Sequence, residues 1–240
     1  MNTLLSESLA DVRRHAVPVC CYVAASLAVA AVYRGVVYLP DGLAWEPLAR
    51  LAFALYLACA SSLVQAVCFA ALGAAIARPM WKWRGPRDGL VRFFMPWLII
   101  NLFLVMLADI HRHFFLLEQE DLASLLELAL MVVHVAALPL GTAIMYWGAL
   151  SWPDLPATLA PLTRFFRLTL QSLGVGLFQY VLLGVRASFL EPDRVWTLAL
   201  YAVTDIPILM LDVIIFAQVW RICMLNSTTP PNADDSPFDF

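Results

Sequence analysis

The amino-acid sequence predicts an all-α polytopic membrane protein, a bundle of about six transmembrane helices with short interfacial helices. Its composition is the first reason. Hydrophobic residues occupy 62% of the 240 positions, the mean hydropathy is +0.79, and charged residues occupy only 14%. A soluble domain is about 45–50% apolar and about 25% charged. A chain of this length has too little interior to bury the excess, so lipid must cover much of the apolar surface.

The spacing of the apolar stretches is the second reason. A helix needs about 20 mostly apolar residues to span a bilayer. Six stretches meet this requirement: residues 16–39, 48–77, 90–110, 122–150, 168–190 and 195–223. Proline, glycine and charged residues separate them, as at Glu191-Pro192-Asp193. The sequence therefore predicts one transmembrane domain over residues 16–225, and we find no internal duplication in it.

Two segments outside the spans are predicted to lie along the membrane surface. Residues 1–15 and 157–167 each place three apolar residues on one helical face, with charges beside them, which is the pattern of an interfacial helix. These faces are Leu5, Leu9 and Val12 in the first segment, and Leu159, Leu162 and Phe166 in the second. The last segment, residues 226–240, is polar, acidic and proline-rich, and it is predicted to be a disordered cytoplasmic tail.

Positive charge predicts the orientation, because lysine and arginine are enriched in cytoplasmic loops. With the N-terminus inside, ten of the 15 lysines and arginines fall on the cytoplasmic side. We therefore expect both termini in the cytoplasm, and we expect a bacterial inner (cytoplasmic) membrane. The lipid bilayer is the predicted partner, and no basic tract indicates nucleic acid.

Helix packing has one clear signal, in the stretch 48–77. Small residues recur there every four positions: Ala54, Ala58, Ser62, Ala66, Ala70 and Ala74. Small side chains let helix backbones approach closely in lipid. We therefore expect this helix to be the central one.

Polar residues inside spans are the main functional candidates. With a rise of about 1.5 Å per residue, one polar residue on each of four helices falls near the predicted midplane: Asn101, His134, Gln179 and Asp205. Asp212 lies seven residues beyond Asp205, about 10 Å closer to the predicted cytoplasmic side. These five residues form the predicted polar layer, with Gln65 and Gln171 at the depth of Asp212.

Asp205 has three interpretations at this stage. It could exchange protons or cations together with His134, as in a transport pathway. It could instead hold helices together by hydrogen bonds, which is common in membrane bundles. Finally, Asp205 before Pro207 resembles a helix start, which would break the last helix near the midplane.

A metal site is not predicted. Asp109, His111 and His113 are weak candidates, because His111 points away from the other two on a helix and a site needs three or four converging ligands. We predict no cofactor and no catalytic residues. Asp205 and Asp212 are about 10 Å apart along one helix, too far for an aspartyl dyad.

The sequence contains no common catalytic motif, so we do not expect an enzyme. The leading functional hypothesis is a non-enzymatic accessory, assembly or scaffolding component of a membrane system, with a membrane-protein partner or a homo-oligomer. The alternative is a small-solute or proton-coupled transporter that uses the predicted polar layer.

Overall fold

The computed structural model describes residues 3–34, 46–77, 90–148, 155–189 and 195–228, and these segments are helical with no strand. The elements are α1 (Thr3–Arg14), α2 (Ala16–Arg34), α3 (Glu46–Ile76), the π-helix η2 (Leu90–Phe94), α5 (Met95–Leu116), α6 (Glu120–Trp147), α7 (Leu155–Arg164), α8 (Phe166–Phe189) and α9 (Val195–Thr228). Six of them are long and apolar enough to cross a membrane. The prediction of an all-α, six-helix membrane bundle is therefore confirmed.

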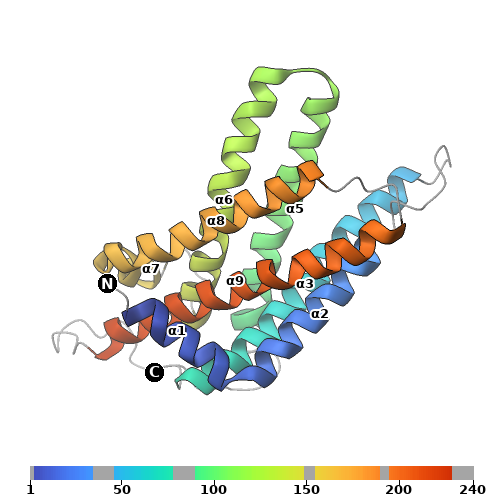
Figure 1. Ribbon diagram of the computed structural model, residues 1–240. Helices are drawn as coiled ribbons and strands as arrows, with labels where there is room; N and C mark the ends of the chain where they lie inside the picture. The colour runs from blue at the N-terminus through green and yellow to red at the C-terminus, as the bar shows by residue number, and fades with distance from the viewer. Residues whose placement is uncertain (1–2, 35–45, 78–89, 149–154, 190–194, 229–240) are drawn as a thin grey trace.

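The long helices form two groups that cross each other (Figure 1). α2, α3 and α9 lie side by side, α8 runs beside α9, and the α5–α6 hairpin crosses them at a steep angle. α1 and α7 lie at the same end of the bundle, near the end of α9. We call this the α1/α7 end. The opposite end is the one at which α2 ends and α9 begins.

Several helix ends differ from the predicted spans. α5 continues to Leu116, past the predicted end at residue 110, because charged residues at a membrane surface do not interrupt a helix. α6 ends at Trp147, since Gly148 adopts the left-handed conformation (φ 65°) that commonly terminates helices. α9 continues through Thr228, into the predicted tail. Residues 229–240 of that tail lie outside the described residues.

The two short helices pack against the bundle, and the faces that contact it include only part of the predicted apolar rows. In α1 the buried residues are Leu4, Ser8, Asp11 and Val12, whereas Leu5 is 41% exposed. α1 contacts α9, and it therefore turns a partly polar face toward the protein and leaves apolar Leu5 exposed. The predicted apolar row of Leu5, Leu9 and Val12 is thus divided, since Leu5 is exposed whereas Val12 packs on the protein.

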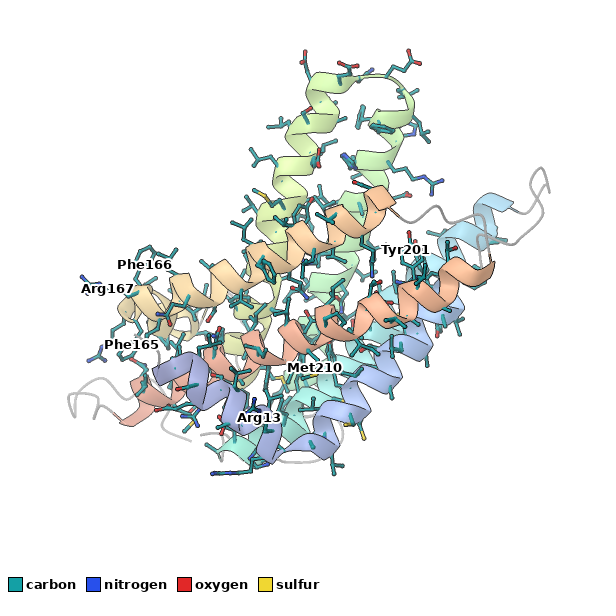
Figure 2. All side chains as sticks on the ribbon, in the orientation of Figure 1. Arg13, Phe165, Phe166, Arg167, Tyr201 and Met210 are labelled. Carbon is teal, nitrogen blue, oxygen red and sulfur yellow. The ribbon has the colours of Figure 1, made fainter. Side chains whose placement is uncertain are left out.

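In α7 the buried residues are Thr158, Pro161 and Leu162. Phe166 was predicted on the same face, but it begins α8 and is 61% exposed at the corner where α7 meets α8 (Figure 2). The helix turns at Phe165, so the helical period does not continue across this position.

The structure contains an internal repeat that we did not find in the sequence. α1–α2 and α7–α8 each consist of a short helix, a one-residue turn (His15 or Phe165) and a long helix. Buried positions of the second unit equal those of the first plus 150: Ser8 and Thr158, Asp11 and Pro161, Val12 and Leu162, Val19 and Thr169, Tyr22 and Ser172, Val29 and Gln179. All six pairs differ in residue type, which hid the repeat from sequence comparison. Both long helices therefore turn equivalent faces inward.

The central helix is α9, and the prediction that residues 48–77 provide it was wrong. In its most apolar stretch 56% of the residues of α9 are buried, against 17% in α3. Trp220 of α9 is fully buried and joins an aromatic cluster with Tyr22, Phe69, Phe216 and Tyr146, with ring centroids 4.5–5.2 Å apart between successive pairs. Stacked and edge-to-face pairs at these distances stabilise the core beyond their buried area.

The small residues of α3 pack only over the middle of the helix. Ala58, Ser62 and Ala66 are buried, but Ala74 is exposed. A four-residue step advances 400° around a helix with 3.6 residues per turn, so the row drifts away from the contact by about 40° at each step. Toward the α1/α7 end Gly73 takes over, because an ideal Cβ there would lie 2.5 Å from the Trp220 indole.

α9 is continuous from Val195 to Thr228, with Pro207 inside it. The alternative in which Asp205 starts a new helix is therefore wrong. The Thr204 hydroxyl donates to the carbonyl of Leu200 at 2.9 Å, a bond within the helix and not a cap. Asp205 instead uses its carboxylate for contacts with other helices.

Candidate functional site: a polar cavity along α9

A cavity of about 220 Å³ lies among α2, α3, α5 and α9. Its wall is mixed, with aliphatic residues and a set of polar side chains. The polar set includes Tyr22, Ser61, Gln65, Asn101, Asp205 and Asp212. Two carboxylates from one helix, separated by two turns, therefore line the same space.

Asp212 is held by neutral groups. The Tyr22 hydroxyl of α2 donates to its Oδ2 at 2.8 Å, and Nε2 of Gln179 in α8 donates to its Oδ1 at 2.5 Å. Gln179 Nε2 also donates to the carbonyl of Ile208 at 3.0 Å. Tyr22 and Gln179 are both almost fully buried. The long helix of each repeat, α2 or α8, thus supplies one hydrogen-bond donor to the Asp212 carboxylate.

Asn101 of α5 forms a second group of polar contacts at the cavity, with residues of α3. Its Nδ2 donates to Ser62 Oγ at 2.9 Å and to Gln65 Oε1 at 2.7 Å. The Ser62 hydroxyl donates in turn to the carbonyl of Ala58. These bonds satisfy buried polar groups and join α3 to α5, and Asn101 and Gln65 still contribute to the cavity wall.

Asp205 is held by cations, at the opposite end of the bundle from α1 and α7. It forms ion pairs with Arg34 at the end of α2 (Nη1 to Oδ2, 2.6 Å) and with Arg186 of α8. Both guanidinium groups also lie over the ring of Tyr201, 4.6 and 5.0 Å from its centroid. Tyr201 is labelled in Figure 2, one turn before Asp205 on α9. We call these four residues the arginine cluster.

A second ion-pair group joins α9 to α1 at the α1/α7 end. Arg221 contacts Asp11 Oδ2 through Nε and Glu7 Oε2 through Nη1, both at 2.5 Å. Asp11 is buried, while the Glu7 side chain is 53% exposed. α9 therefore carries an ion-pair group on each side of Asp212.

The predicted polar layer is divided in the structure. Asn101, Asp205 and Asp212 line one cavity, and Gln179 hydrogen-bonds to Asp212, whereas the carboxylate of Asp205 contacts the two arginines. The predicted depths assumed that helices start at one plane. α9 has 34 residues, about 51 Å of helix, so its residues cannot be placed by counting from one end.

His134 does not pair with Asp205 in the described part of the chain, contrary to the first interpretation. Its ring lies on α6 beside Tyr180 of α8, with centroids 5.5 Å apart. Gln171 also lies outside the cavity wall, and its buried Oε1 has no hydrogen-bond partner among the described atoms. Of the two glutamines predicted at the depth of Asp212, only Gln65 therefore lines the cavity.

The three weak metal candidates lie near the tip of the α5–α6 hairpin. Asp109 and His113 are exposed; the His113 ring contacts Phe114, and the His111 ring contacts Phe115. Among the described residues, no three His, Cys, Asp or Glu side chains converge as a metal site would require.

The residues of this site that sequence reasoning missed include Tyr22, Arg34 and Arg186. The two arginines were counted only as charges outside the membrane, and Tyr22 has no charge to attract attention in an apolar span. One signal was available for the arginines. Each lies within a few residues of the end of its helix, where a long side chain can reach either headgroups or a buried acid.

Comparisons with protein-family models, with curated proteins and with solved structures found no match. A carboxylate with neutral donors can bind and release a proton, and amide and hydroxyl groups around it can hold a small polar solute.

Proposed function

We propose that this integral membrane protein is a small-solute transporter coupled to protons, with Asp212 as the proton-exchanging residue. The observation that carries the proposal is the cavity beside Asp212, between the arginine cluster and the Arg221 ion pairs. An ionisable residue inside a span is costly and normally marks a pathway. Its neutral partners Tyr22 and Gln179 would tolerate both the charged and the protonated carboxyl group.

The two ion-pair groups fit an occluded state of such a transporter. Alternating access requires the pathway to open on one side at a time, usually by movement of one repeat against the other. The arginine cluster joins α2 of the first repeat to α8 of the second through Asp205. The Arg221 pairs join α1 to α9. Breaking either group would release helices at one end only.

Proton movement in proteoliposomes tests the proposal. A pH-sensitive dye is enclosed, an inward proton gradient is imposed, and small carboxylates, phosphate, amino acids and sugars are added in turn. The wild-type protein should acidify the vesicle interior with at least one solute, and Asp212→Asn should abolish this signal. Glu127→Gln, which removes an exposed carboxylate of α6, is the matched control. Equal proton movement by wild type and Asp212→Asn would refute the role of Asp212, and no signal above empty vesicles would refute proton coupling.

We infer that both termini are cytoplasmic, in a bacterial inner membrane. Arg13, Arg14, Arg164, Arg167 and Arg221 all belong to the helices of the α1/α7 end, which supports this orientation by the positive-inside rule. A C-terminal epitope tag should be digested by protease in inside-out vesicles and protected in intact spheroplasts.

We also infer that the protein is not an enzyme, since its sequence has no catalytic motif.

A second candidate is the accessory or scaffolding role, and one observation favours it. The distal half of the α5–α6 hairpin projects beyond the other helices (Figure 1). Its large apolar side chains are exposed: Met106, Phe115, Leu116, Leu125 and Val132. Either lipid, a second copy or another membrane protein must cover them in a membrane. Mild-detergent purification with mass determination separates these cases, and a stoichiometric protein partner would favour the accessory role.

A further inference from the structure

The arginine cluster contains more positive than negative charge among its described side chains. Two guanidinium groups, from Arg34 and Arg186, face the single carboxylate of Asp205. All three side chains are largely buried, with exposed fractions of 20%, 15% and 10%. A partly desolvated cluster with one excess cation favours an additional or a stronger anion.

Arg186 has donor capacity that Asp205 does not use. Its Nε is buried and has no hydrogen-bond partner among the atoms that the structure describes. A guanidinium group matches a carboxylate or phosphate best when two parallel N–H groups bind two oxygens. Asp205 is fixed to α9, divides its two oxygens between two arginines, and leaves this donor unpaired.

Asp205 also separates the arginines from the cavity. It lines the cavity wall and is bonded to both guanidinium groups. A solute in the cavity would meet Asp205 first, and it would reach Arg34 and Arg186 only after the Asp205 carboxylate had moved aside. The carboxylate therefore occupies the position that an incoming anion would take.

We propose that Arg34 and Arg186 form an oxyanion-binding site, for a carboxylate or phosphate group, in which Asp205 is the internal competing ligand. This inference rests on the proposed transport function and specifies its solute as a small oxyanion. Binding of the solute would displace Asp205 and release the link between α2 and α8. The same chemistry could come from the headgroup of an anionic lipid, so the experiment has to separate the two sources.

The test is anion binding to the purified full-length protein, by calorimetry and thermal unfolding, with chloride at equal ionic strength as the reference. Inorganic phosphate and succinate are the soluble probes. In Asp205→Asn the competing charge is gone, so the apparent Kd for at least one probe should fall about tenfold or more. The matched control is the triple variant Arg34→Gln/Arg186→Gln/Asp205→Asn, which should show no specific response.

Nanodiscs of phosphatidylglycerol or phosphatidylcholine identify the source. Soluble anions stabilise Asp205→Asn equally in both lipids if the solute is free, whereas phosphatidylglycerol alone stabilises it if a headgroup is bound. The proposal is overturned if Asp205→Asn responds to phosphate, succinate and phosphatidylglycerol no more than the triple variant does.

Asp205→Asn could fail to fold because two arginines lose their acid. Arg186→Gln keeps the ion pair between Arg34 and Asp205, which has no net charge. This variant is therefore used for a second measurement. The wild-type protein should be stabilised by phosphate or succinate, and Arg186→Gln should lose that response. Equal responses in the two proteins would overturn the proposal. These measurements involve no proton movement, so loss of the oxyanion site leaves the test of Asp212 intact, and the reverse also holds.

Discussion

Asp205 and Asp212 lie two turns apart on α9 and line one cavity, yet their surroundings are opposite. Asp205 contacts two arginines that also lie over an aromatic ring. Asp212 contacts a tyrosine hydroxyl and a glutamine amide. Both residues are aspartates on the same helix, so the difference comes from the neighbouring helices.

The two acids differ in the charge of their partners: cations contact Asp205, and neutral donors contact Asp212. A nearby cation favours the ionised carboxylate and penalises its protonation. Neutral donors stabilise a carboxylate without opposing protonation to the same degree, because no cation is left uncompensated. The transport proposal therefore places proton exchange at Asp212, whose partners are neutral.

The largest expected effect on stability is at Asp205. Asp205→Ala leaves Arg34 and Arg186 facing each other, and removing one partner of a buried ion pair destabilises by about 3 kcal/mol or more. Chemical unfolding in mixed micelles should show this loss. The variant Arg34→Gln/Arg186→Gln/Asp205→Asn removes all three charges and should recover most of it. If the triple variant lost more unfolding free energy than Asp205→Ala, the cluster would not be a charge-compensated unit.

A smaller effect is expected at Tyr22, which donates to Asp212. Tyr22→Phe removes one hydrogen bond and leaves the ring on Phe69, so we expect a loss of about 1 kcal/mol. The substitution should also change the pH dependence of proton movement, because one donor to the ionised carboxylate is missing. Tyr180→Phe, on the same face of the bundle as His134 and outside the cavity wall, should leave that pH dependence unchanged.

Asp212→Asn should affect stability less than Asp205→Ala, although it should abolish transport. Its side chain keeps the size and one oxygen acceptor, and its two partners are neutral, so we expect about 1 kcal/mol at most. Thermal unfolding and the proteoliposome assay on one preparation give both values. A loss as large as that of Asp205→Ala would mean that Asp212 is also compensated by charge, and the contrast between the two sites would fail.

The smallest effects are expected at the α1 contact. Glu7→Gln removes an exposed partner of Arg221 and should cost about 0.5 kcal/mol or less, as for surface ion pairs. Asp11→Asn removes the buried partner and should cost more. Limited proteolysis of α1 measures this order directly. Equal susceptibility of the two variants would show that the Asp11 contact does not hold α1 on α9.

Much of the candidate site could be predicted one residue at a time, but not as an arrangement. Asn101, Gln179, Asp205 and Asp212 stand out as polar residues in apolar spans, and each has a polar contact between helices in the structure. Their grouping was only partly right: Asn101, Asp205 and Asp212 line one cavity, but Gln179 bonds to Asp212 and Asp205 contacts the arginines. The partner proposed for Asp205, His134, lies beside Tyr180 instead.

The sequence by itself determined that the chain is a six-helix membrane protein, because apolar length and composition depend on single segments and on the thickness of the bilayer. It could not determine that α9 is central, since several spans are equally apolar and burial depends on which helices surround each one. The internal repeat was also visible only in three dimensions, where burial recurs although residue types differ. The different surroundings of Asp205 and Asp212 have the same cause: tertiary packing brings their neighbours from distant parts of the chain.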